Sequence, residues 1–257
     1  MRLGTTSYIY PADIITNVRR LAGKVRDVEL ILFELDDGPN SLPDDNTISE
    51  LKSLGAGHDM TYTVHLPLDL RLASERPAVS KAIRAIRNTE RLLPHGYIVH
   101  LEGEEDLKEP DDLKRWTDNS IRSLEIICGE VMHSGQVCVE NLENHSQLML
   151  ESVLDRMPVS CCVDVGHLWK QGVNPLPFLD RWLSRARVVH MHGVGDRDHK
   201  RLSLMSPMEL DPVVEVLRER FQGVLTFEVF SERDFSDSLA AFQESSRRAA
   251  ARSPHRR

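Results

Sequence analysis

Val188-Val189-His190-Met191-His192 is a short apolar run that ends in histidine, and the same pattern recurs along the chain. Residues 61–65 read Thr-Tyr-Thr-Val-His, and residues 98–100 read Ile-Val-His. Runs of this length, rich in β-branched residues, are typical of buried β-strands. We predict eight such strands, at residues 2–8, 27–34, 60–65, 96–101, 136–141, 159–165, 187–192 and 224–230.

Helical patterns separate these runs. Residues 77–93 begin with proline and place Val79, Ile83 and Ile86 at helical spacing, and residues 110–132 and 207–221 also begin with proline. Alternating strands and helices indicate parallel strands joined by crossover helices. Eight such units in a chain of 257 residues predict an α/β fold, a single (β/α)₈ TIM barrel.

The alternative fold is an open, doubly wound sheet with a glycine-rich nucleotide loop. Residues 4–7, Gly-Thr-Thr-Ser, contain one glycine and no G-x-G-x-x-G follows the first strand, which favours the closed barrel. We expect one catalytic domain over residues 1–244. Residues 245–257 are rich in serine, arginine and alanine, and we predict a disordered tail there.

Composition narrows the class of protein. Lys and Arg total 32 against 40 Asp and Glu, a formal charge of −8, which argues against a nucleic-acid partner. We find neither a signal peptide nor the roughly 18 consecutive apolar residues of a membrane span, so we expect no membrane partner. The four cysteines have no C-x-x-C spacing, which indicates a reduced, cytoplasmic protein.

Polar residues collect at the ends of the predicted strands. Side chains alternate between the two faces of a strand with a period of two. In residues 224–230 the apolar Leu225, Phe227 and Val229 can face the helices, so Glu228 points into the barrel. The same reasoning directs further acidic and imidazole side chains inward: Glu140, Asp164, His190 and His192.

Histidine is enriched at these positions. The last three positions of eight strands hold about a tenth of the chain, so about one of its 11 histidines would fall there by chance. Four do so, and two more follow directly behind strands: His65, His100, His190, His192, His167 and His199. Carboxylates buried beside them without a cation would carry a large desolvation cost. The pattern therefore predicts a metal site at the carboxyl ends of the strands.

Imidazole and carboxylate ligands without thiolate suit zinc, manganese, iron or cobalt. We expect one to three divalent ions, with zinc or manganese preferred, and Glu140 in a central position from which it can bridge two of them. Asp69 and Asn141 are candidates to orient the histidines. Glu34 and Glu102 have a parity that could bring them to the barrel mouth. Four other histidines are expected to be solvated: His58, His95, His133 and His145.

This ligand series resembles the xylose-isomerase-like TIM barrels, which include endonuclease IV and the sugar epimerases. The resemblance covers roughly residues 2–232. It implies a four-ligand core, with further histidines completing a polynuclear site as in the endonuclease branch. The implied core is Glu140, Asp164, His192 and Glu228, and the implied additions are His65, His100 and His167. Whether His190 or His192 is the ligand from the seventh strand stays open, because the two share the same parity. Asp196-Arg197-Asp198-His199 matches the branch's Asp-x-His only loosely, so a third ion at His199 stays open.

Three longer stretches are similar to the cobamide-remodelling phosphodiesterases: Gly-Thr-Thr-Ser-Tyr-Ile-Tyr-Pro-Ala-Asp at residues 4–13, His-Leu-Pro-Leu-Asp-Leu-Arg-Leu-Ala at 65–73, and His-Met-His-Gly at 190–193. The resemblance implies hydrolysis of the phosphodiester in the nucleotide loop of a cobamide. Two metal ions can clamp the attacking and leaving oxygens of such a reaction. Glu140 and Glu228 are then the expected catalytic residues. Arg71, Lys200 and Arg201, in the loops after the third and seventh strands, are candidates to bind the substrate.

Three other functions remain open. A sugar isomerase or epimerase would use one ion with Glu140 and Glu228 as an acid–base pair. It needs few histidines beyond the core, and the sugar branch has an arginine where this chain has Asp198. A DNA-repair AP endonuclease shares the ligands, but this chain lacks an evident basic stretch. A non-enzymatic barrel would not require so many convergent ligands, so we expect a small-molecule substrate, a cobamide or a sugar.

Overall fold

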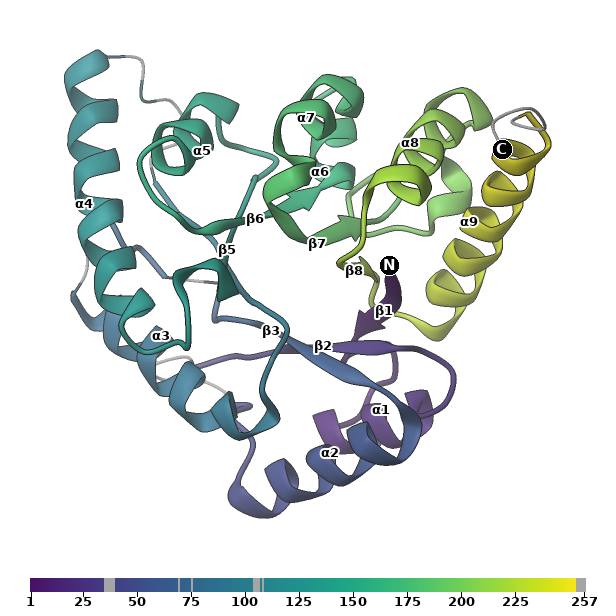
Figure 1. Ribbon diagram of the computed structural model, residues 1–257, viewed down its shortest axis with the longest axis horizontal. Helices are drawn as coiled ribbons and strands as arrows, with labels where there is room; N and C mark the ends of the chain where they lie inside the picture. The colour runs from purple at the N-terminus through teal and green to yellow at the C-terminus, as the bar shows by residue number, and fades with distance from the viewer. Residues whose placement is uncertain (35–39, 69, 75, 104–106, 108, 253–257) are drawn as a thin grey trace.

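Eight parallel strands form one closed barrel in the computed structural model, which describes residues 1–34, 40–68, 70–74, 76–103, 107 and 109–252. Each strand pairs with its neighbours in sequence, and β1 pairs with β8 to close the ring (Figure 1). The strands are β1 Arg2–Thr6, β2 Asp27–Ile31, β3 Thr61–His65, β4 Tyr97–Val99, β5 Val137–Glu140, β6 Ser160–Asp164, β7 Ala186–Met191 and β8 Val224–Phe227. The prediction of a single (β/α)₈ barrel is confirmed.

Helices surround the barrel (Figure 1). They are α1 Ile14–Leu21, α2 Asp45–His58, α3 Arg76–Thr89, α4 Pro110–Cys128, α5 Gln147–Leu154, α6 Val165–Lys170, α7 Pro175–Trp182, α8 Pro207–Arg220 and α9 Glu232–Arg252. Proline occupies the first turn of α4 and α8, where its missing N–H costs no helical hydrogen bond. A capping box at Ser206 and Glu209 adds a start signal to α8.

Several strands end before the limits that we predicted. β4 stops at Val99 and β8 at Phe227, so His100 and Glu228 each lie one residue past the end of a strand. The pattern could not show this, because an apolar run continues into the loop while its backbone leaves the sheet. The functional side chains therefore lie at the carboxyl ends of the strands, the usual place for a site in this fold.

The interior of the barrel has an apolar layer and a polar layer. Ile98, Cys138, Cys162 and Val188 form a small buried cluster separate from the main core between the strands and helices. Each lies two residues before one of the polar residues at the mouth: His100, Glu140, Asp164 and His190. On the side of β4 to β7, apolar residues thus lie directly below the polar residues of the mouth.

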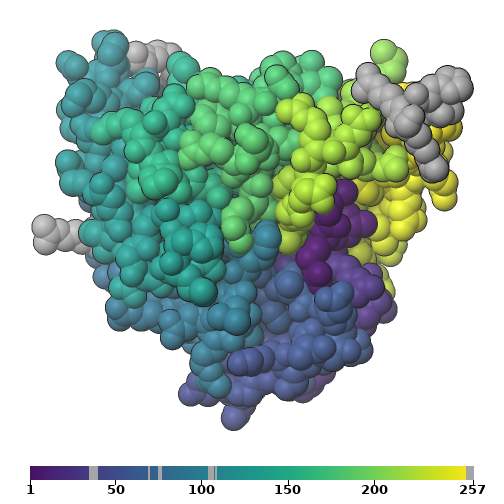
Figure 2. Space-filling model, viewed as in Figure 1, coloured from purple at the N-terminus to yellow at the C-terminus, as the bar shows by residue number. Residues whose placement is uncertain are grey.

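Residues 245–252 are not a disordered tail. They continue α9, which packs against β8 through contacts of Phe227 with Phe235 and Phe242. In the space-filling view the purple N-terminal residues lie beside yellow α9, near where the ring closes (Figure 2). The sequence suggested fraying because this stretch is polar and terminal. Its buried face, which includes Ser245 and Ala249, becomes evident only in the packed molecule. Residues 253–257 lie outside the described residues.

We expect Asp211→Ala to detach the end of α9. The Asp211 carboxylate on α8 is buried and accepts hydrogen bonds from Ser245 (2.8 Å), Arg248 (2.7 Å) and Arg252 (2.9 Å). Its loss should lower the free energy of unfolding by about 2 kcal/mol. Urea unfolding measures this loss, with Asp237→Ala, a half-buried acid near Arg201, as the control expected within about 0.5 kcal/mol. Equal stabilities of the two variants would contradict the expectation.

No helix in the described ranges is long and apolar enough to span a bilayer.

Candidate metal centre

Glu140, Asp164, His190 and Glu228 meet at the mouth of the barrel. They come from β5, β6 and β7 and from the residue after β8, and their potential ligand atoms lie within 4.8 Å of one another. His190 Nδ1 is 3.1 Å from Glu228 Oε2, 3.2 Å from Glu140 Oε1 and 3.7 Å from Asp164 Oδ2. All four residues are buried. One imidazole nitrogen thus faces three carboxylates, a donor set that suits a divalent cation.

The resemblance placed His192 in this group, and the structure places His190 there. Asp164 on β6 is directly paired with His190 on β7, whereas His192 lies just past the end of β7. Both histidines have inward parity, so alternation alone could not separate them. His192 Nε2 lies 3.3 Å from Asp164 Oδ1, but only His190, through the register of the two strands, also comes within 3.2 Å of Glu140 and Glu228.

A second group shares Glu140. His65 Nε2 lies 3.4 Å and His100 Nε2 lies 3.2 Å from Glu140 Oε2, and the two rings meet edge to face with centroids 4.8 Å apart. The other oxygen of Glu140, Oε1, faces His190. One carboxylate therefore points its two oxygens at two different groups of candidate ligands.

His167, His192 and His199 form a third group. The rings of His192 and His199 lie 4.3 Å apart, and His167 is 5.5 Å and 5.6 Å from them. Our sequence analysis missed Glu143, whose Oε2 lies 3.4 Å from His167 Nε2. Glu143, His167 and Asp198 also lie close enough together to bind one metal ion. Glu143 follows the fifth strand in a loop, where parity does not predict direction.

Unpartnered buried atoms mark this centre. Within the part of the chain that the structure describes, four of its atoms are buried without a hydrogen-bond partner: His65 Nε2, Asp164 Oδ2, His192 Nε2 and Glu228 Oε2. A buried polar atom that lacks a partner costs about 1–3 kcal/mol. These atoms belong to all three groups of candidate ligands, and bound cations would satisfy them. The residues present therefore fit divalent metal ions.

When no cation is bound, the buried carboxylates of the centre favour the protonated forms of the histidines beside them. Burial by itself lowers the pKa of His100 and His192, but the neighbouring carboxylates outweigh it. Glu140 raises the pKa of His100 to about 10, and Asp164 raises that of His192 to about 9. Conversely, burial favours a raised pKa for Glu140, but His190 and His100 hold it well below its usual range. Metal ions would have to displace these protons.

Metal binding should therefore tighten as the pH rises from 6 towards 9. Protons compete for His192 and His100 until the pH exceeds their pKa values of about 9 and 10. Calorimetry at pH 7 in two buffers of different ionisation enthalpy should show net proton release on zinc binding. Binding without proton release would contradict this.

The stability of the metal-free protein should depend on pH in the opposite direction. The raised pKa values of His100 and His192 stabilise the folded state fully below about pH 6.5, and this stabilisation is lost as the pH rises through 9 to 10.

The predicted substrate-binding residues lie apart from one another. Arg71 is exposed and lines a groove of about 860 Å³ together with Glu102 and Arg115, and Glu102 Oε1 lies 3.8 Å from His100 Nδ1. Lys200 instead pairs with Asp196 at 3.2 Å. Arg201 has Nε 3.9 Å from the Asp237 carboxylate. Of the three predicted substrate-binding residues, Arg71 lines the groove beside His100, and Lys200 and Arg201 pair with carboxylates elsewhere.

The residues that we predicted to lie near the histidines or at the barrel mouth have different positions in the structure. The Asn141 side chain exchanges hydrogen bonds with the backbone of Asp164, at 2.8 and 2.9 Å. The backbone oxygen of Asn141 also lies 2.9 Å from His167 Nδ1, so Asn141 contacts both a carboxylate residue and a histidine of the centre. Glu34 does not enter the mouth, because it pairs with Arg84 on α3. Asp69 lies outside the described residues.

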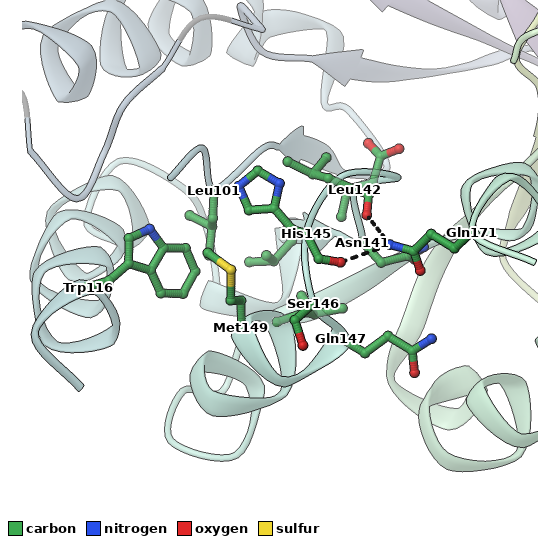
Figure 3. A pocket seen from close by; sticks show the side chains of 12 residues that line it. Leu101, Trp116, Asn141, Leu142, His145, Ser146, Gln147, Met149 and Gln171 are labelled. Carbon is green, nitrogen blue, oxygen red and sulfur yellow. Dashed lines mark hydrogen bonds between the residues drawn. The ribbon is translucent and has the colours of Figure 1, made fainter. Parts of the chain in front are cut away.

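His145 is buried, contrary to our expectation of a solvated side chain. Its Nε2 accepts a hydrogen bond from the Gly103 N–H at 3.1 Å, which ties the loop after β5 to the loop after β4. Gln171 donates to the backbone oxygens of Leu142 and His145 in the same wall (Figure 3). The cavity there measures about 20 Å³, room for one water molecule, so this wall is closely packed beside Glu140.

We expect Gly166→Ala to displace His192. A Cβ at Gly166 would lie 2.2 Å from the His192 ring, far inside contact distance, because the ring packs directly on the glycine backbone. Metal content should fall while the barrel stays folded, as measured by elemental analysis and circular dichroism. The matched control is Gly57→Ala on α2, where a Cβ meets nothing within 4 Å. Unchanged metal content in both variants would contradict a role for His192 in the third group.

The closed barrel and the acidic and imidazole residues at its mouth define the class: a TIM barrel with a candidate metal centre. The chain belongs to the xylose isomerase-like TIM barrel family, whose model matches residues 23–252. No curated protein matches the sequence.

Solved structures similar to this one include sugar epimerases and an endonuclease. A D-tagatose 3-epimerase-like protein is 19% identical, with 98% of this chain and 99% of that chain covered and a TM-score of 0.80. Endonuclease IV from Thermus thermophilus is 17% identical, with 96% and 100% covered and a TM-score of 0.69. A 3-keto-D-glucoside 4-epimerase from E. coli is 16% identical, with 98% and 99% covered and a TM-score of 0.68. These likenesses support the fold.

Proposed function

We propose that this protein is a metal-dependent hydrolase that cleaves a phosphodiester, with the nucleotide loop of a cobamide as its substrate. The observation that carries the reaction class is the position of Glu140. One of its oxygens faces His65 and His100, and the other faces His190. With His167, His192 and His199 adjoining, the candidate ligands exceed what a one-ion site needs.

Divalent ions bound in these groups would supply Lewis acidity for activating water and for neutralising phosphoryl oxygens. The protein's own residues hold that arrangement in place. Glu140 joins the first two groups, and Glu228 Oε2 lies between His190 Nδ1 at 3.1 Å and His199 Nδ1 at 3.6 Å. Glu140 and Glu228 are therefore the residues that we propose as catalytic.

The cobamide substrate rests on the sequence resemblance of residues 4–13, 65–73 and 190–193. The groove of about 860 Å³ beside His100 is consistent with it, because the groove lies within the size range of ligand pockets and carries the exposed Arg71. An arginine there suits a phosphate or another anionic group of the substrate.

A sugar isomerase or epimerase is the second candidate. Sugar epimerases recur among the similar structures, and this comparison supports an epimerase better than it supports a cobamide hydrolase. In that reaction Glu140 and Glu228, on either side of His190, would exchange a proton at the carbon next to a carbonyl. Because endonuclease IV is among the similar structures, DNA cleavage is also tested.

One experiment separates these reactions. Metal-replete protein is incubated in parallel with a cobamide, a panel of ketohexoses and a duplex with an abasic site. Chromatography should show nucleoside released from the cobamide and no change in the others. Interconversion of a ketose with its epimer, with the cobamide intact, would overturn the proposal in favour of the epimerase. Strand cleavage alone would favour the endonuclease.

A further inference from the structure

Glu29 lies directly beneath the candidate metal centre. It belongs to β2, points into the barrel and is fully buried. Its shortest hydrogen bond joins Oε2 to His190 Nε2 at 2.9 Å. Our sequence analysis missed Glu29 and considered Glu34 on the same predicted strand instead.

The two nitrogens of His190 face different surroundings. Nδ1 faces Glu140, Asp164 and Glu228, whose oxygens lie 3.1–3.7 Å away. Nε2 faces Glu29 alone among these carboxylates. A neutral imidazole has one N–H donor and one acceptor lone pair, so a proton on Nε2 leaves the lone pair on Nδ1. That lone pair is the one directed at the carboxylate group.

We propose that Glu29 is a positioning residue, which keeps the His190 proton on Nε2 and thereby directs Nδ1 to a divalent metal ion. The inference rests on the metal centre of the proposed function and is independent of the reaction catalysed there. Carboxylates behind metal-binding histidines commonly act in this way, and their loss lowers metal affinity about 10- to 100-fold.

The other polar groups around the Glu29 carboxylate lie farther from it than His190 does. The Thr226 hydroxyl lies 3.4 Å from Oε2, and that of Thr63 lies 3.5 Å away but is only 2.8 Å from Asp27 Oδ1. Within the described residues, Glu29 Oε1 is buried without a hydrogen-bond partner. His190 therefore provides the strongest interaction that holds this carboxylate, and the two side chains fix each other.

The test compares Glu29→Gln with Asp27→Asn. Asp27 is equally buried on the same strand and face, two residues deeper, and makes no hydrogen bond to His190. Zinc affinity, measured by competition with a chelator, should fall about 10- to 100-fold in Glu29→Gln and less than about threefold in Asp27→Asn. The visible absorption of bound Co²⁺ should shift only in Glu29→Gln. Circular dichroism of the metal-free variants checks that both are folded.

A second measurement needs no variant of Glu29. In the zinc-loaded protein, NMR of the histidine nitrogens should find His190 protonated on Nε2, with the resonance assigned by its loss in His190→Asn. A proton on Nδ1 would overturn the inference, as would equal zinc affinities in wild type and Glu29→Gln. A wild-type protein that binds no divalent metal would overturn the proposed metal centre together with this inference, so the two failures are distinguishable.

Discussion

Glu140→Gln should lower turnover by about 10³-fold or more while substrate affinity changes little. Glutamine has nearly the same size, so the buried site keeps its shape. Its amide nitrogen, however, cannot accept a hydrogen bond or bind a cation, so either the His65 and His100 group or the His190 group loses a ligand. Binding contacts remote from the reacting bond remain, so the effect should fall on kcat rather than on KM.

The measurement pairs steady-state kinetics with elemental analysis of Glu140→Gln. The control is Glu130→Gln, which removes a carboxylate that pairs with Arg87 on the surface and should keep wild-type kinetics. A Glu140→Gln protein that retains both its metal and full activity would show that Glu140 does not join the two groups.

His190→Ala should reduce metal affinity by more than about 100-fold, beyond the range expected for residues that only support a ligand. It removes the imidazole that, among the described residues, groups with Glu140, Asp164 and Glu228. His192→Ala should spare that group and reduce the number of bound ions, because His192 lies one layer nearer the mouth with His167 and His199.

Zinc stoichiometry and affinity of both variants provide the test. His58→Ala, an exposed histidine at the end of α2, should match the wild type. If His192→Ala instead abolished the tight site and His190→Ala did not, the four-ligand group would be the one with His192.

Alternation along single strands predicted part of this centre and failed elsewhere for a definite reason. In β8, Leu225 and Phe227 belong to the core against the helices, so Glu228 had to face inward. In β2, Asp27-Val28-Glu29-Leu30 alternates polar and apolar residues, but the strand ends at Ile31 rather than at residue 34. Because the predicted strand extended to residue 34, the sequence analysis considered Glu34 at its end and overlooked Glu29.

The sequence by itself determined the eight-fold alternation of strands and helices, and with it the barrel and the gathering of histidines and carboxylates at one end. It did so because periodicity and strand polarity are properties of a single segment. Only the folded molecule shows that His190 faces three carboxylates whereas His192 faces Asp164, that Glu140 faces two groups at once, and that residues 245–252 pack as helix. These depend on register between strands and on packing between distant segments, which no local pattern encodes.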